Sequence, residues 1–237
     1  MANARARRGR NDRMLSSNVE SERPFRFMRS NPSRVECSQH DSTAQPAVSV
    51  LMPCYNAEDT VDKAVQSILQ QSLERLELIL VDDGSRDGTA AKLAEWASSD
   101  RRVRVIARSH EGILGALNAG LSHCQAPYVA RMDADDIAHP ERLARQVETL
   151  DAHPDLAVVG SLVEGFPQED VREGFRIYLD WLNRLVTHDA IVREIFIESP
   201  LAHPSVCMRR RWLERVGGYQ DHGWPEDYDL WLRLYLA

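Results

Sequence analysis

Short apolar strands and amphipathic helices alternate between residues 48 and 150, and this alternation limits the possible folds more than any other feature. Apolar runs at 48–52 and 76–81 are each followed by polar turn residues and a helical period, and 103–107 and 128–132 repeat the arrangement. Strands that alternate with helices through short joins favour a parallel sheet covered by helices on both faces. We therefore predict an α/β fold.

The hydrophobic periodicity also gives the expected bounds of the other elements. Two further strands are expected at 156–159 and 205–208. The expected helices span 59–71, 87–98 with Asp87 as N-cap, 113–124, 140–150, 178–186, 189–197 and 227–236.

The first part of the chain differs in composition from the rest. The 237 residues have a net charge of −7, yet residues 1–34 hold nine arginines against three acidic residues. The remainder is therefore strongly acidic, which argues against nucleic acid as a partner. Residues 1–46 show no apolar period and predict a disordered, Arg-rich leader. It could be a transit peptide, a basic arm that contacts an anionic membrane surface, or a solvated tail, and we favour the tail.

Polar residues follow three of the predicted strands at the point where each strand ends. They are Pro53-Cys54-Tyr55-Asn56, Asp82-Asp83-Gly84-Ser85 and Asp133-Ala134-Asp135-Asp136. Ligands of open α/β sheets bind beyond the carboxyl ends of the strands. The three carboxylates of the last segment repel one another unless a cation neutralises them, which predicts Mg²⁺ or Mn²⁺ together with diphosphate oxygens. The alternative is an acidic turn in which Asp136 caps the next helix.

The other two strand ends have a functional and a plain interpretation. Asp82 and Asp83 can accept hydrogen bonds from a base or a ribose, or simply form a turn. Tyr55 can offer a ring to a base or pack on the sheet edge, and Asn56 can cap a helix. The chain lacks GxGxxG, GxxxxGK[ST] and GxSxG motifs, so dinucleotide, P-loop and hydrolase chemistry lose their main support.

Acidic residues also open the last predicted helix, at Glu226 and Asp227. They are either favourable charges at a helix N-terminus or a carboxylate base for an acceptor hydroxyl. His203 precedes a predicted strand, where a lone histidine is more often structural. The four scattered cysteines suit a reducing cytoplasm, and no apolar stretch is long enough to cross a bilayer.

Taken together, these segments resemble the family 2 glycosyltransferases. The matching segments are 48–72, 76–89, 116–143, 203–210 and 223–234. The resemblance implies a GT-A type fold, with a Rossmann-like, mostly parallel central sheet flanked by helices on both faces. It also implies a nucleotide-sugar-binding half at about 47–136 and an acceptor-side half at about 137–237, within a domain that spans 47–237.

The resemblance implies a role for each matching position. For the nucleotide, Pro53, Tyr55 and Asn56 would line the nucleobase pocket, Asp83 would accept from the uracil edge, and Asp133 would bind ribose. The metal would be held by Asp135 and Asp136. The catalytic base would be Asp227, and the donor or acceptor site would be lined by Glu226 and His203.

The implied function is metal-dependent, inverting transfer from a nucleoside-diphosphate sugar, with UDP as the expected nucleotide and Mn²⁺ or Mg²⁺ as the metal. The acceptor would be a sugar, a lipid-linked molecule or a polysaccharide. The reaction would belong to cell-surface polysaccharide or glycolipid synthesis, in the cytoplasm or at the inner face of the membrane.

Processive members of the family have a Gln-x-x-Arg-Trp motif after the Glu-Asp pair, whereas this chain stops at Ala237. We therefore expect the chain to be truncated. The alternatives are an inactive, truncated nucleotide-binding domain and a sugar nucleotidyltransferase.

Overall fold

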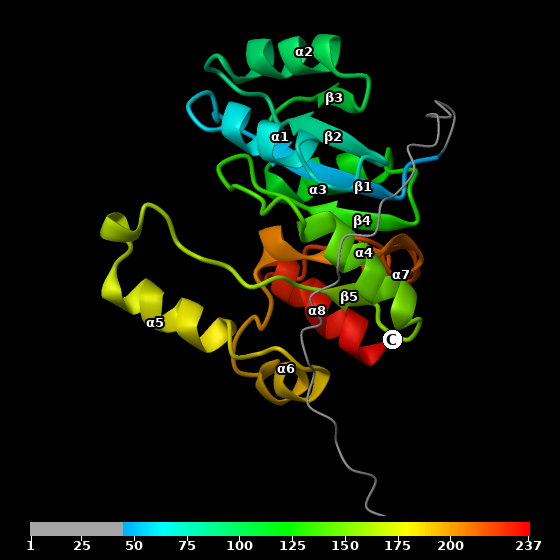
Figure 1. Cartoon of the computed structure of the whole chain (residues 1–237), viewed down its shortest axis with the longest axis vertical. Helices are drawn as coiled ribbons and strands as arrows, with labels where there is room; N and C mark the ends of the chain where they lie inside the picture. Colours follow the sequence, from blue (N-terminus) through cyan, green and yellow to red (C-terminus); the bar gives the residue numbers. More distant parts are fainter. Residues whose placement is uncertain (1–44) are drawn as a thin grey trace, which may run out of the picture. The chain divides into compact units, whose positions relative to one another are not determined.

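A computed structural model describes residues 45–237 of the chain (Figure 1). The predicted leader at 1–46 lies almost wholly outside these residues, so its predicted disorder and its membrane contact stay predictions. Across the described part of the chain, no helix combines the length and the apolar character needed to cross a membrane.

The described elements form one mixed α/β arrangement. In chain order they are β1 (Val48–Cys54), α1 (Val61–Leu69), β2 (Leu76–Asp82), α2 (Thr89–Ser99), β3 (Val103–Ala107), α3 (Ile113–Leu121), β4 (Tyr128–Arg131), α4 (Arg142–Ala152), β5 (Val158–Val159), η1 (Gln168–Asp170), α5 (Glu173–Leu182), α6 (His188–Glu194), η2 (His203–Ser205), β6 (Cys207–Arg209), α7 (Arg210–Arg215) and α8 (Glu226–Leu236).

The central sheet has six strands in the order β3-β2-β1-β4-β6-β5. The first four strands are parallel, and β6 runs antiparallel to both β4 and β5. The predicted, mostly parallel sheet is therefore confirmed. The chain leaves β1 toward β2 on one side and later returns to pair β4 on the other side, so the strand order reverses between β1 and β4. In open α/β sheets such a reversal opens a crevice at the carboxyl ends of the strands.

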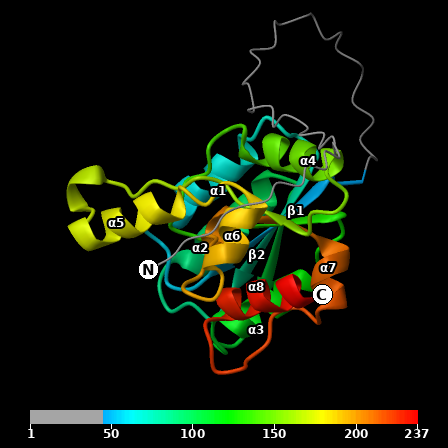
Figure 2. The same cartoon turned by 90° about the horizontal axis from the view of Figure 1, so that it is seen from below.

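Two hydrophobic clusters cover the two faces of the sheet. Alternate residues of β1 divide between them, with Val50 and Met52 in one cluster and Leu51 in the other. The first cluster contains the buried faces of α1, α2 and α4, and the second contains those of α3, α7 and α8. Figure 2 shows α1 and α4 above the strands and α3 and α8 below them. The expected helices on both faces are therefore confirmed.

Several predicted bounds were wrong by a few residues. The helix predicted at 59–71 spans 61–69, the helix at 113–124 ends at 121, and the strand at 156–159 is reduced to 158–159. Asp87 lies one residue before the helix N-cap position, and its Oδ1 accepts from the Thr89 backbone N–H at 3.0 Å. Such shifts are expected because turn residues at element ends satisfy the same hydrogen bonds in several ways.

Residues 161–200 differ from the rest of the described chain because they bury few side chains. The helix expected at 178–186 begins five residues earlier, at Glu173, and Leu182 is the one buried residue within α5. Within α6, no residue is buried. Figure 1 shows α5 standing away from the sheet, on the side toward which the parallel strands point.

Candidate active site

The predicted site residues of the first half meet at the reversal between β1 and β4. A cavity of about 410 Å³ opens there, between the turn after β1 and the turn after β4. Its lining residues are Pro53, Tyr55, Asn56, Ala57, Asp59, Thr60, Asp133, Ala134 and Asp135. Five predicted site residues from two segments about 80 residues apart in sequence therefore share one cavity.

The turn after β1 is fixed by hydrogen bonds to the turn after β2. Asn56 has a positive φ of 50°, which Asn tolerates better than most residues. Its backbone N–H donates to Ser85 Oγ at 3.0 Å, and its Oδ1 accepts from the Arg86 N–H at 2.8 Å. The side chain thus ties two turns together, and Asn56 does not cap the following helix, since Thr60 is the N-cap of α1.

Tyr55 presents an aromatic surface at the cavity. Its ring is 42% exposed and stacks on His110, with ring centroids 4.1 Å apart and planes inclined by 17°. His110 follows β3, so a fourth strand end contributes to the site. Sequence analysis did not identify His110 as a site residue, and it lies three positions past the end of β3. Its place at the carboxyl edge of the sheet was the signal that could have identified it.

Asp83 is buried, and its carboxylate organises the loop after β3. Backbone N–H groups of Glu111 and Gly112 donate to it at 3.1 and 2.9 Å. Arg108 Nε lies 3.4 Å from Oδ1, and His110 Nδ1 lies 2.8 Å from Oδ2. A carboxylate accepts about four hydrogen bonds, so a uracil edge would have to replace one of these contacts. His110 is about half exposed and is the partner that a ligand can reach.

The acidic turn after β4 has carboxylates in different environments. Asp133 is about one-third exposed and is ion-paired with Arg131. Asp135 is exposed and lines the cavity. Asp136 lies deeper and does not line it, and burial together with the charges of Asp133 and Asp135 raises its pKa to about 6.

This acidic turn suits a hard divalent cation. Asp133 and Asp135 face a cavity large enough for diphosphate, and Mg²⁺ or Mn²⁺ is commonly bound by one or two carboxylates together with substrate phosphates. Within residues 45–237, no three histidine, cysteine or acidic side chains form a ready-made metal cage. The residues therefore fit a metal that arrives with its anionic ligand.

Arg131 is a buried cation beside the acidic turn that sequence analysis missed. It is the last residue of β4 and only 3% exposed, and its Nε has no hydrogen-bond partner among the described residues. Its positive charge acts to lower the pKa of Asp136 and also those of His203 and Glu226. A charged residue in an otherwise apolar strand, two positions before the Asp-x-Asp motif, was the available signal.

The Glu-Asp pair lies in the first turn of α8, next to His203. Glu226 Oε1 is 3.6 Å from His203 Nδ1, and His203 Nε2 is 3.1 Å from the Tyr219 hydroxyl. The contact with His203 lowers the pKa of Glu226, while burial lowers the pKa of His203. Asp227 Oδ2 accepts a hydrogen bond from Ser199 Oγ at 3.2 Å. The structure therefore brings Glu226 and His203 together, while Asp227 bonds to a segment that carried no sequence motif.

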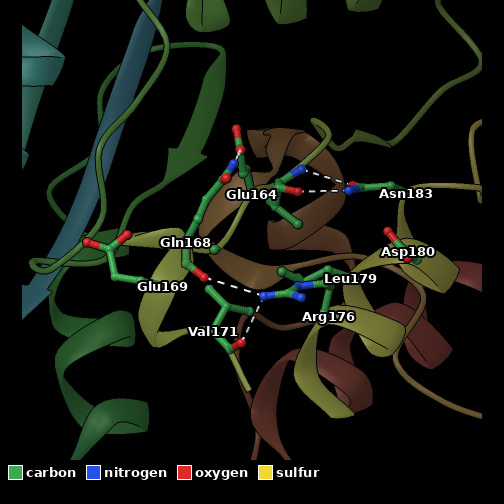
Figure 3. A pocket seen from close by; sticks show the side chains of 10 residues that line it. Glu164, Gln168, Glu169, Val171, Arg176, Leu179, Asp180 and Asn183 are labelled. Atoms are coloured by element: carbon green, nitrogen blue, oxygen red, sulfur yellow. Dashed lines mark hydrogen bonds between the residues drawn. The ribbon is translucent and has the colours of Figure 1, made fainter. Parts of the chain in front are cut away.

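A second cavity, of about 510 Å³, lies between α5 and the loop that precedes it (Figure 3). None of the predicted site residues lines it. Arg176 donates there to the backbone oxygens of Gln168 and Val171, and the Asn183 side chain pairs with both backbone groups of Val163. These polar side chains are therefore used to hold the loop.

Comparison with known proteins agrees with this architecture. The family model described as Glycosyl transferase family 2 matches residues 49–217. A putative glycosyltransferase EpsE from Bacillus subtilis is 36% identical over 195 residues, which is 80% of this chain and 67% of the relative. The amylovoran biosynthesis glycosyltransferase AmsE from Erwinia amylovora is 33% identical over 78% of this chain and 68% of its own length. An uncharacterized glycosyltransferase from Haemophilus influenzae is 31% identical, and the chain spans 59% of its length.

Solved structures show the same fold. The mannosyltransferase PcManGT from Pyrobaculum calidifontis, in complex with GDP-Man and Mn²⁺, superposes with a TM-score of 0.62 at 23% identity, over 82% of this chain and 53% of that protein. S. aureus TarS 1–349 in complex with UDP-GlcNAc gives a TM-score of 0.63 at 20% identity, over 80% and 53%. The fold is therefore that of GT-A glycosyltransferases, and the chain belongs to glycosyltransferase family 2.

Proposed function

We propose that this chain is a metal-dependent, inverting glycosyltransferase that uses a nucleoside-diphosphate sugar, with UDP as the nucleotide. The observation that carries the proposal is the cavity at the strand reversal, where Asp133 and Asp135 meet Tyr55 and Asn56. An aromatic face beside two carboxylates suits a nucleotide at one end and a metal-bound diphosphate at the other. The complexes of PcManGT with GDP-Man and Mn²⁺ and of TarS with UDP-GlcNAc support this assignment.

The donor would be held by residues of four strand ends. The exposed ring of Tyr55, backed by His110, would stack on the nucleobase. Asp83 would accept from the uracil edge in place of one of its present partners, of which His110, with Nδ1 at 2.8 Å, is about half exposed. Asp133 would accept from the ribose, while Arg131 fixes the orientation of its carboxylate. Pro53 and Asn56 would shape the wall of the pocket.

Asp135, with Asp136 behind it, would hold the divalent metal. When bound, such a metal stabilises the negative charge that grows on the leaving diphosphate. Burial, and then the charges of Asp133 and Asp135, raise the pKa of Asp136, and a bound divalent cation would oppose both effects. The fixed positive charge of Arg131 lies behind the same turn and would favour an anionic donor.

Asp227 would be the base that takes the proton of the acceptor hydroxyl as its oxygen attacks the anomeric carbon. Ser199 donates to Oδ2 of Asp227 and would leave Oδ1 directed at the acceptor. Glu226 is held by the buried His203 and would line the site without taking the proton. A single displacement of this kind inverts the anomeric centre and needs no enzyme nucleophile.

The proposal extends to the acceptor and the compartment. We place the reaction in cell-surface polysaccharide or glycolipid synthesis, because the relative AmsE is named for amylovoran biosynthesis. The described free cysteines, Cys54, Cys124 and Cys207, are buried thiols, which suits a reducing cytoplasm. Contact of the basic leader with the inner face of a membrane remains part of the same proposal.

The test is the release of nucleoside diphosphate from a panel of UDP- and GDP-sugars, with Mn²⁺ or Mg²⁺ present. We expect one sugar nucleotide to give nucleoside diphosphate, and chelation of the metal to stop its release. Asp227→Asn should lose this release, and Asp189→Asn is its matched control, because Asp189 is an exposed acid in the first turn of α6. Release of pyrophosphate would identify a nucleotidyltransferase instead, and no turnover of any donor by folded protein would support an inactive domain.

A further inference from the structure

Three aromatic side chains form a ladder along one side of α5. The rings of Phe175 and Tyr178 are stacked at 6.0 Å between centroids, and those of Tyr178 and Trp181 lie 5.7 Å apart. A ladder in the interior of a protein would be core packing, but Leu182 is the only buried residue of this helix. Phe175 is 52% exposed, and the other two rings are partly exposed. These rings are therefore available to a ligand.

The segment after α6 links the ladder to the candidate catalytic base. Ser199 donates to Asp227 at 3.2 Å, and the charge of the preceding residue, Glu198, contributes to the raised pKa of Tyr178. Burial raises the pKa of Tyr178, and the charges of Glu198 and Asp227 raise it further. Tyr178 and Asp227 are therefore linked through two adjacent residues, Glu198 and Ser199. Helix α5 extends away from the sheet, and its N-terminal end, where Phe175 falls in the sequence, is the outer one (Figure 1).

We propose that Phe175, Tyr178 and Trp181 form the platform on which the acceptor binds, and that the acceptor is a saccharide. This inference rests on the proposed function, since it assigns the second substrate of the same site. A pyranose offers a face of C–H groups with positive partial charge, which packs on the negative face of an aromatic ring. Its hydroxyls need hydrogen-bond acceptors, and Glu198, whose charge acts on Tyr178, supplies an exposed carboxylate. Three successive rings offer stacking positions for more than one sugar unit.

The charges of the segment argue against a lipid surface as the occupant. Helices that lie on anionic membranes carry an excess of Lys and Arg on their polar face. In α5 the charged residues are Glu173, Arg176 and Asp180, and in α6 they are Asp189, Arg193 and Glu194. Acidic side chains outnumber basic ones in both helices, so an anionic membrane would be repelled. A neutral, polyhydroxylated ligand carries no such penalty.

The test measures saccharide binding without any nucleotide. Saturation-transfer difference NMR is recorded on the full chain with methyl glucoside, methyl galactoside, methyl mannoside and cellobiose at millimolar concentration. We expect a signal from the C–H protons of at least one saccharide. Phe175→Ala and Tyr178→Ala should weaken its binding about two- to tenfold, whereas Tyr178→Phe should retain it. Ile177→Ala is the matched control, because Ile177 is 64% exposed on the same helix and takes part in none of the ring contacts.

Calorimetry of UDP and GDP with Mn²⁺ on the same variants separates the two proposals. Loss of saccharide binding in Phe175→Ala with intact nucleotide binding supports the platform. Absence of nucleotide binding in the unaltered chain contradicts the proposed function, while the saccharide measurement still tests the ladder. No saccharide signal, or one that Phe175→Ala leaves unchanged, overturns the inference. Binding to phosphatidylglycerol vesicles that falls in both Phe175→Ala and Ile177→Ala would overturn it in favour of membrane insertion.

Discussion

Residues 47–136 and residues 137–237 differ in how their surface side chains are supported by the core. In the first region every residue of β1 and β2 is buried, and the turns that follow are tied to one another by hydrogen bonds. The second region places large apolar side chains in solvent. Those more than half exposed are Ile137, Leu162, Phe166, Phe175, Ile177, Val186, Phe196, Ile197, Trp224 and Leu236.

From this difference we expect ligands to be recognised by fixed polar groups in the first region and by exposed apolar side chains in the second. A surface built from strand ends is positioned by the sheet itself, so the first region holds its polar groups at fixed places before any ligand arrives. The segment between β5 and β6 has little packing of its own to fix it. On the proposed acceptor platform, ligand recognition would depend on exposed aromatic side chains, which a change of sequence can alter without disturbing the core.

The largest effect is expected at Asp227, where the two regions act on the same reaction. Asp227→Asn keeps the shape of the side chain but removes its ability to take a proton. We expect about a 10²–10⁴-fold loss of transfer rate, with nucleotide affinity unchanged. Steady-state rates and calorimetry on the same preparation measure both quantities. Full transfer activity in this variant would mean that the base lies elsewhere.

Removing the ring of Tyr55 tests the preformed surface of the first region. Tyr55→Ala is expected to weaken nucleotide binding by about 1–3 kcal/mol, which is the stacking contribution of one base. Tyr55→Phe is the control, since it keeps the ring on His110 and should bind as the unaltered chain does. Equal affinities in all three proteins would show that the base does not stack here.

A pair of glycine substitutions compares the packing of the two regions directly. In Gly120→Ala the new Cβ would lie 2.1 Å from Leu51 Cδ1, so we expect a loss of about 1–3 kcal/mol from the free energy of unfolding. In Gly174→Ala of α5 the new Cβ meets nothing within 4 Å, and we expect a gain of about 0.5–1 kcal/mol. Denaturant titration of both variants gives the sign of each change. A stable Gly120→Ala would show that the first region is less tightly packed than described.

The smallest effect is a pH dependence at His203. Burial lowers the pKa of this imidazole in the folded chain below its usual value of about 6.5, although Glu226 opposes the shift. The unfolded chain then binds the proton more readily, so stability is lost as the pH falls below about 6.5. His203→Gln should show a smaller fall of the melting temperature between pH 7 and 5.5. An unchanged slope would mean that His203 titrates normally despite its burial.

Sequence patterns predicted the first region better than the second, and the reason is physical. Strands β1, β2 and β4 are mostly apolar, because both of their faces are buried, and such strands are easy to recognise. Helix α7 was missed, since it has six residues and follows β6 without a turn. Few side chains in 161–200 are buried, and the bounds of the helices there were predicted less accurately, since α5 begins five residues before its predicted start.

The candidate site was predicted in its residues but not in its contacts. The turns that carry Tyr55, Asn56 and Asp135 were found, because polar residues at strand ends are visible in the sequence. The pairing of Asp83 with the loop after β3, and the stacking of His110 on Tyr55, depend on the order of strands in the sheet. No local pattern specifies that order, and it becomes known only when the strands are paired.

The most direct test of the central claim is calorimetric titration of UDP and GDP with and without Mn²⁺, on the unaltered chain and on Asp135→Ala. Exposed Asp155 supplies the control substitution, Asp155→Ala. The account predicts that one nucleotide binds only with Mn²⁺, that Asp135→Ala abolishes this binding, and that Asp155→Ala preserves it. Nucleotide binding that is independent of both Mn²⁺ and Asp135, or no binding at all by folded protein, would contradict it.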